Sequence, residues 1–147
     1  TIISLAILKH SVIDMSIRQE YLRAASESRK ETSSLKNGFE ELNKNEEFLL
    51  AITSKGFGKR SSAYEYRITN RGGSGVTNIT ITPKNGRVIQ SLKVNLDDNI
   101  ALISDSGKLL RCNVGDNIRV VGRVSQGVSV FKIDAKEKIV SVARLED

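Results

Sequence analysis

Several residue types are scarce in this chain of 147 residues, which has one cysteine, one proline and no tryptophan. The single cysteine, Cys112, excludes a disulfide framework and is typical of a reducing cytoplasm. No apolar run approaches the roughly 20 residues that a membrane-spanning helix needs. The apolar segment 2–8 has no basic residues before it and no small-residue cleavage site after it. We therefore expect neither a signal peptide nor a membrane partner.

Residues for catalysis or metal binding are also scarce. The one histidine, His10, has no nucleophile near it in sequence, and no cluster has metal-ligand spacing. The segment 56–60 resembles a phosphate-binding loop only superficially, because Arg60 stands where that loop needs Ser or Thr, and Thr53 where it needs Gly. We expect no active site, metal or cofactor in this chain.

The charge is distributed unevenly along the chain. Residues 1–46 hold seven Lys or Arg and seven Asp or Glu, whereas residues 47–147 hold sixteen and ten, so the whole net charge of +6 lies in the second part. A basic, glycine-rich segment suggests a polyanionic partner, although this charge alone also fits other classes of protein.

The second part repeats itself at an offset of 51 to 52 residues. Leu49–Gly56 matches Ile100–Gly107, because each is an apolar run followed by a small polar turn and a glycine. Further matches join 70–76 to 122–128, 79–81 to 131–133 and 88–94 to 139–145.

The local patterns predict strands. Short β-branched runs alternate with Gly, Asn, Asp and Ser at strand-and-turn spacing, and Asn85-Gly86 predicts a tight hairpin. A repeat of this length with about four antiparallel strands fits an all-β, propeller-like array, with blades at 47–96 and 97–147. The segment 2–8 matches 139–145, which makes 1–10 the expected closing strand of a preceding blade, so we expect the chain to be a fragment.

Residues 11–46 stand outside the repeat and predict a partly helical insertion. Ser16 and Gln19 form a capping box, with Ser16 as N-cap, and Ile17, Tyr21 and Ala24/Ala25 share one face of a helix that ends near Lys30. The rest, to Glu46, is polar and mostly featureless. A solvated insertion and a partner-binding helix are both open interpretations.

The cations of the second part are candidates for phosphate binding. In the segment 67–75, the glycines would let main-chain amides approach a phosphate closely, and Arg71 could donate to two phosphate oxygens at once. A tight turn between strands is the alternative explanation of the same glycines. Other cations recur beyond the turn glycine of each repeat, which predicts a charged stripe on one rim, suited to a bent duplex. The candidate residues are Lys59, Arg60, Arg67, Arg71, Lys108, Arg111, Arg119 and Arg123.

These segments together resemble a known family. Seven segments are similar to blades of the C-terminal domain of the bacterial DNA gyrase A protein: Glu47-Phe48-Leu49-Leu50, Gly56-Phe57-Gly58-Lys59-Arg60, Tyr64-Glu65-Tyr66-Arg67, Arg71-Gly72-Gly73-Ser74-Gly75, Leu110-Arg111, 122–128 and the ending 138–145. The insertion resembles an extra segment between blades of alphaproteobacterial gyrases. The resemblance covers 47–147 and, less fully, 1–10.

The resemblance implies a six-bladed β-pinwheel whose basic edge wraps double-stranded DNA and supports negative supercoiling. It also implies partners, gyrase B and the rest of gyrase A in an A2B2 complex, and a place in the cytoplasm near the nucleoid. The catalytic tyrosine and the use of ATP and Mg lie elsewhere in that enzyme, so Tyr21, Tyr64 and Tyr66 inherit no catalytic role. Leu145-Glu146-Asp147 looks like a family C-terminus. The glutamine-led box of the first blade is absent, so this fragment is expected to assist wrapping.

Two alternatives to this interpretation remain open on the sequence alone. The related domain of topoisomerase IV barely wraps DNA and selects the substrate. A propeller-like protein-interaction module would use the same cations only for solubility.

Overall fold

The structure, a computed structural model, describes residues 1–9, 11–31, 34–35 and 38–145. His10, for which the sequence predicts no catalytic role, and Glu146–Asp147 of the expected C-terminus lie outside the described residues. The helices and strands are α1 (Met15–Glu31), α2 (Glu40–Asn45), β1 (Phe48–Thr53), β2 (Phe57–Ser62), the 3-10 helix η1 (Ala63–Glu65), β3 (Val88–Val94), β4 (Asn99–Ser104), β5 (Leu109–Asn113), α3 (Val114–Asn117), β6 (Val128–Ser129) and β7 (Ile139–Leu145).

The two repeats fold as equivalent antiparallel units, which confirms the all-β prediction. Each begins with a hairpin, β1–β2 or β4–β5, and its first strand also pairs with a closing strand, β3 or β7. The hairpin turns hold equivalent glycines, Gly56 with φ 75° and Gly107 with φ 83°. Glycine adopts this left-handed conformation without the steric cost of a Cβ atom.

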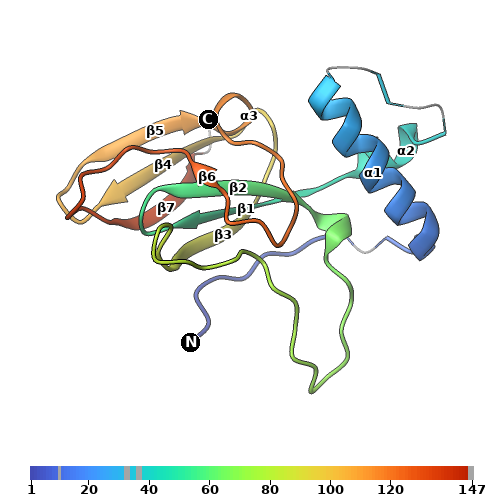
Figure 1. The fold of residues 1–147 in the computed structure, drawn as a ribbon, viewed down its shortest axis with the longest axis horizontal. Helices are drawn as coiled ribbons and strands as arrows, with labels where there is room; N and C mark the ends of the chain where they lie inside the picture. The colour runs from blue at the N-terminus through green and yellow to red at the C-terminus, as the bar shows by residue number, and fades with distance from the viewer. Residues whose placement is uncertain (10, 32–33, 36–37, 146–147) are drawn as a thin grey trace.

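The sheets do not follow the boundary between the repeats. The first sheet has the order β3-β1-β2-β6, so its fourth strand comes from the second repeat, and the second sheet has three strands in the order β5-β4-β7. Phe57 pairs with Ser129, and Gly58 pairs with Val128. The first repeat is therefore a unit of sequence whose sheet is completed by its neighbour, as Figure 1 shows where β6 lies beside β2.

One hydrophobic core joins the two repeats. Leu50, Ile52 and Val94 of the first repeat lie in the same buried cluster as Ile100 and Ile139 of the second. Burial of these side chains is the main favourable contribution to folding. Each repeat therefore depends on the other for part of its core.

The Asn85-Gly86 pair forms a turn but not the predicted hairpin. Gly86 has φ 75°, and its N–H donates to the main-chain oxygen of Thr82 at 3.0 Å. However, β3 pairs with β1 rather than with the segment before the turn. Asn85 is fully buried, and its amide nitrogen donates to Thr80 O at 2.8 Å and to Gln126 O at 3.0 Å. The turn therefore serves as a contact between the repeats.

The N-terminal segment differs from the prediction, because residues 1–9 form no strand. In each repeat the closing strand pairs with the first strand of that repeat, and the described residues include no third copy of such a first strand. The segment instead runs past β3, where the main-chain N–H of Ser91 donates to Ser4 Oγ at 3.3 Å. Ile2, Leu5 and Ile7 are left 83–91% exposed.

The insertion contains the predicted helix, with a different cap. The carboxylate of Asp14 accepts the N–H of Ser16 at 2.8 Å, so Asp14 caps α1 and Ser16 lies in its first turn. The helix α2 was not predicted, because its polar sequence lacks an apolar face. The main-chain oxygen of Leu42, on this helix, accepts the hydroxyl of Tyr64 at 3.0 Å.

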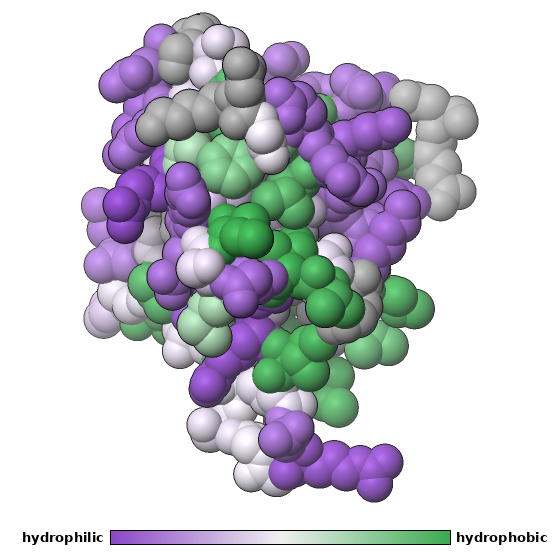
Figure 2. Space-filling model, turned by 90° about the vertical axis from the view of Figure 1, so that its right-hand side faces the viewer, coloured by the Kyte–Doolittle hydropathy of each residue, from purple (hydrophilic) through white to green (hydrophobic). Residues whose placement is uncertain are grey.

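The helix α1 is docked on the repeats. Tyr21 and Ala25 are buried with Tyr64 of η1, and the two tyrosine rings meet edge to face at 5.5 Å. The hydroxyl of Tyr21 also donates to Glu46 Oε2 at 2.8 Å. Figure 2 looks onto this side of the molecule and shows a band of apolar residues between hydrophilic flanks. The insertion is thus attached to the first repeat, and its own Val12, Met15 and Ile17 are exposed.

Candidate nucleic-acid interface

Lys59 does not lie on an exposed rim, and this part of the prediction is wrong. Its side chain is fully buried, and its ammonium group donates to Ser61 Oγ at 2.9 Å, to Gly122 O at 3.2 Å and to the main-chain oxygen of Arg123. Burial lowers the pKa of Lys59 to about 8, and the nearby Arg123 contributes to the lowering while Glu65 opposes it. Lys59 therefore connects the two repeats.

Arg60 is also buried, with 5% of its surface exposed, so its predicted rim position is wrong too. Its Nε donates to Ile118 O at 2.6 Å and one terminal nitrogen, Nη2, donates to Gly115 O at 3.4 Å. The other terminal nitrogen, Nη1, is buried without a hydrogen-bond partner among the described residues. Burial lowers the pKa of this guanidinium, and the nearby charge of Arg29 adds to the effect.

Lys108 and Arg123 are engaged in contacts within the protein. The ammonium group of Lys108 lies 3.0 Å from a carboxylate oxygen of Asp134 and 3.0 Å from one of Glu137. The guanidinium of Arg123 donates to Thr77 O, and its main-chain N–H donates to Glu65 Oε2 at 2.7 Å. A phosphate would have to compete with these partners.

The other four predicted cations are exposed: Arg67, Arg71, Arg111 and Arg119. Arg67 and Arg71 belong to the loop 66–78, which extends away from the sheets in Figure 1. Gly72 and Gly75 in this loop have φ 79° and 73°, with open space where a Cβ would stand. Glycine is favoured at these two positions because of the positive φ, not because a Cβ would meet another atom. The contact of Arg71 with a phosphate remains a prediction.

The cations expected to form one stripe do not share a single exposed rim: Lys59, Arg60, Arg67, Lys108, Arg111 and Arg119. Lys59 and Arg60 are buried. The others lie apart, because the β4–β5 turn that carries Lys108 is at the left edge of Figure 1, whereas the loop 66–78 hangs below the sheets on the right. Arg60 and Arg111 occupy equivalent positions, opposite Leu50 and Ala101 in their hairpins. They differ in exposure because a segment of the second repeat covers β2, while β5 is an edge strand.

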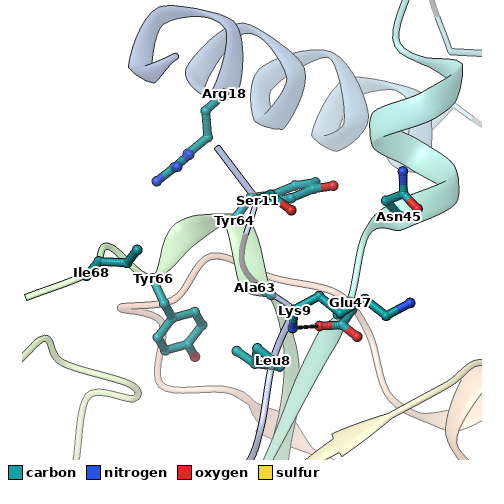
Figure 3. Close-up of a pocket in the computed structure, with 10 residues that line it drawn as sticks. All are labelled: Leu8, Lys9, Ser11, Arg18, Asn45, Glu47, Ala63, Tyr64, Tyr66 and Ile68. Carbon is teal, nitrogen blue, oxygen red and sulfur yellow. Dashed lines mark hydrogen bonds between the residues drawn. The ribbon is translucent and has the colours of Figure 1, made fainter. Parts of the chain in front are cut away.

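A small pocket of about 320 Å³ lies between the N-terminal segment, the insertion and η1. Figure 3 shows Lys9 donating its main-chain N–H to the carboxylate of Glu47, at 2.7 Å, with Arg18 and Tyr66 on other walls. Glu47 is also held by Lys93 at 2.5 Å. The described residues that line the pocket include no histidine or cysteine.

The described residues contain no group of three or more His, Cys, Asp or Glu side chains arranged to hold a metal ion. Within the same residues, no helix has the length and apolar character needed to cross a membrane.

Comparison with known proteins agrees with this geometry. The family model described as the DNA gyrase C-terminal domain, beta-propeller, matches residues 47–95 and 98–146. The DNA gyrase A protein of Rickettsia prowazekii is 50% identical over 107 residues, which cover 73% of this chain and 12% of that protein. The DNA gyrase A protein of Granulibacter bethesdensis is 35% identical over 96% of this chain and 18% of its own length. The chain thus spans less than a fifth of these curated relatives.

Two solved structures share the fold. A DNA gyrase A C-terminal domain matches with a TM-score of 0.62 and 30% identity, over 67% of this chain and 33% of that one. The C-terminal domain of a DNA topoisomerase IV matches with the same TM-score and 20% identity, over 76% of this chain and 32% of its own. Since the family model covers both repeats, this chain belongs to the DNA gyrase C-terminal domain, beta-propeller family.

Proposed function

We propose that this chain is a module that binds and helps to wrap double-stranded DNA in the A protein of a DNA gyrase. The observation that carries the proposal is the match of both repeats to the gyrase family model. The four exposed arginines, Arg67, Arg71, Arg111 and Arg119, support it, because guanidinium groups are suited to phosphate contacts that do not depend on base sequence.

The module has no catalytic role of its own in this proposal. It acts within an ATP-dependent type II topoisomerase, together with gyrase B and the rest of gyrase A in an A2B2 complex, at the nucleoid in the cytoplasm. ATP and Mg serve the other parts of that enzyme. The relatives named above, both of them gyrase A proteins, support this assignment.

The test is the salt dependence of duplex binding by the full-length protein. Replacing Arg67, Arg71, Arg111 and Arg119 by Ala should lower the slope of log K against log salt concentration by about 0.9 for each phosphate that is no longer neutralised. A control that removes four other exposed cations, Lys44, Lys132, Lys136 and Lys138, each replaced by Ala, measures the effect of the same loss of charge. An unchanged slope in the arginine variant would contradict DNA binding and favour a protein-interaction module.

A further inference from the structure

A second basic surface lies between the insertion and the second repeat, where cations of α1 face Arg60 and Arg119. A groove of about 950 Å³ separates α1 from the segment 115–122 of the second repeat. Figure 1 shows α1 standing beside the sheets on the side where α3 lies. Among the described lining residues, Glu65 is the one carboxylate, and the cations are Arg23, Arg29, Lys30, Arg60 and Arg119.

The geometry of α1 directs its cations to the same side. Arg23, Ser26 and Lys30 follow spacings of three and four residues, which place side chains on one face of a helix, and all three line the groove. At a rise of 1.5 Å per residue, Arg23 and Lys30 are about 10 Å apart along the helix, roughly three base-pair steps of a DNA strand. Among the described residues, no carboxylate forms an ion pair with either cation, and both are exposed.

Arg60 adds a buried positive charge to the wall of this groove. Its side chain donates to the main-chain oxygens of Ile118 and Gly115, so no carboxylate among the described residues compensates its charge. Its Nη1 has no hydrogen-bond partner in the same part of the chain. A buried cation in this state raises the positive potential nearby, because the protein interior screens it less than water does. Arg29, by contrast, is paired with Glu46 at 2.5 Å.

We propose that this groove binds the phosphodiester backbone of double-stranded DNA, so that the insertion provides a second DNA contact beside the repeats. The inference rests on the proposed function and extends it. Arg119 connects the two surfaces, because it is one of the exposed predicted cations and also lines the groove. The described residues bring no aromatic side chain to the groove, so they offer no platform for stacking unpaired bases.

An acidic protein segment is the competing occupant, and the lining favours DNA. Leu22, Val120 and Val121 are the larger apolar residues there, and each is only half-buried. A stable protein interface usually has a fully buried apolar core with aromatic residues, which the described lining lacks. Charged groups spread along an open groove are instead typical of contacts with a nucleic-acid backbone.

The test replaces Arg23 and Lys30 by Gln in the full-length protein. We expect binding of a duplex at about 0.1 M salt to weaken by roughly tenfold or more, and the slope of log K against log salt to fall by up to about 1.8. The matched control, Lys44→Gln with Lys132→Gln, removes the same charge from exposed sites outside the groove and should change the slope less. Circular dichroism checks that α1 still forms.

The outcomes separate the two proposals. If the four-arginine variant lowers the slope and the α1 variant does not, the groove assignment fails while the proposed function stands. If neither variant changes the slope, both fail. If the α1 variant keeps duplex binding but loses salt-sensitive binding of a poly-glutamate peptide, the groove is a protein-binding site and the inference is overturned.

A crosslink gives an independent measurement. Ser26 lines the groove between the two cations, so Ser26→Cys, in a Cys112→Ser background, should crosslink to a duplex that carries a thiol-reactive group on its backbone. Ser141→Cys, at an exposed position on β7 outside the groove, should crosslink much less. Equal crosslinking at the two positions would contradict the inference.

Discussion

The ammonium nitrogen of Lys59, on β2 of the first repeat, lies 3.2 Å from the main-chain oxygen of Gly122, sixty-three residues later in the second repeat. The main chain beside it joins the same segments, because Arg60 N donates to Arg119 O at 2.9 Å and Val121 N donates to Arg60 O at 2.8 Å. The contact between neighbouring repeats, a main determinant of stability in repeat proteins, is therefore partly polar here.

Replacing Lys59 by Met should destabilise the protein. The substitution removes the ammonium donor to the main-chain oxygens of Gly122 and Arg123. Gly122 O still accepts the N–H of Ser125 at 3.0 Å, so the loss falls mainly on the partly buried Arg123 O, and an acceptor that loses its partner costs about 1–3 kcal/mol. Urea denaturation followed by circular dichroism measures the change in the free energy of unfolding. Lys132→Met, at an exposed position, is the control. A free energy of unfolding equal to that of the wild type would show that Lys59 does not join the repeats.

Burial of Lys59 also predicts that the free energy of unfolding depends differently on pH in the wild type and in Lys59→Met. The pKa of Lys59 is about 8 in the folded state, against an ordinary value of 10.5, because the side chain is buried. Between these values the unfolded chain binds more protons than the folded one, so this group makes stability rise with pH. The free energy of unfolding of the wild type, relative to that of Lys59→Met, should therefore increase from pH 8 to pH 10.5. A constant difference across this window would contradict the lowered pKa.

The strands of the two repeats could be predicted because each sequence pattern recurs in a second copy, whereas the strand expected at 1–10 does not form. The offset of 51 residues between Gly56 and Gly107 predicted two equivalent turns, and both glycines have positive φ. The helix of the insertion was also predicted, although its cap was placed at Ser16 instead of Asp14. These features depend on local patterns that are visible in a single sequence.

The exposure of the cations could not be predicted in the same way. Arg60 and Arg111 have equivalent places in their repeats, yet only Arg60 is covered, since 118–129 returns to β2 from the second repeat. Burial of a lysine or arginine is uncommon enough that an exposed position is the reasonable expectation for Lys59 as well. The helix α2 escaped prediction because it is short and polar.

A network around Glu137 predicts sensitivity to acid. Hydrogen bonds from Ser104, Ser106 and Lys108 lower the pKa of this carboxyl from 4.5 to about 2. A lowered pKa contributes stability that is fully present above pH 4.5 and is lost as the pH falls toward 2. The wild type should therefore lose stability relative to Glu137→Gln over this window, as measured by thermal unfolding at each pH. Glu41→Gln, exposed on α2, serves as the comparison, and parallel curves for Glu137→Gln and the wild type would refute the prediction.

Substitutions at the two hairpin glycines should show how much of the protein's stability comes from the contact between the repeats. Gly56 and Gly107 have similar positive φ values, so an alanine at either position carries the same conformational cost of about 1–2 kcal/mol. A Cβ at Gly56 would lie 2.4 Å from the main-chain oxygen of Phe131, whereas no described atom lies within 4 Å of one at Gly107. Moreover, Gly56 O accepts the N–H groups of Val130 and Phe131, both at 3.0 Å.

Gly56→Ala should therefore displace the returning segment of the second repeat, and Gly107→Ala should leave it in place. We expect Gly107→Ala to lower the free energy of unfolding by about 1–2 kcal/mol, and Gly56→Ala to lower it by a clearly larger amount, since steric overlap adds to conformational strain. Hydrogen exchange at the amides of Val130 and Phe131 reports on the contact itself. Those amides should exchange faster in Gly56→Ala than in Gly107→Ala. Equal loss of stability and equal exchange in both variants would mean that the first hairpin turn does not hold the second repeat.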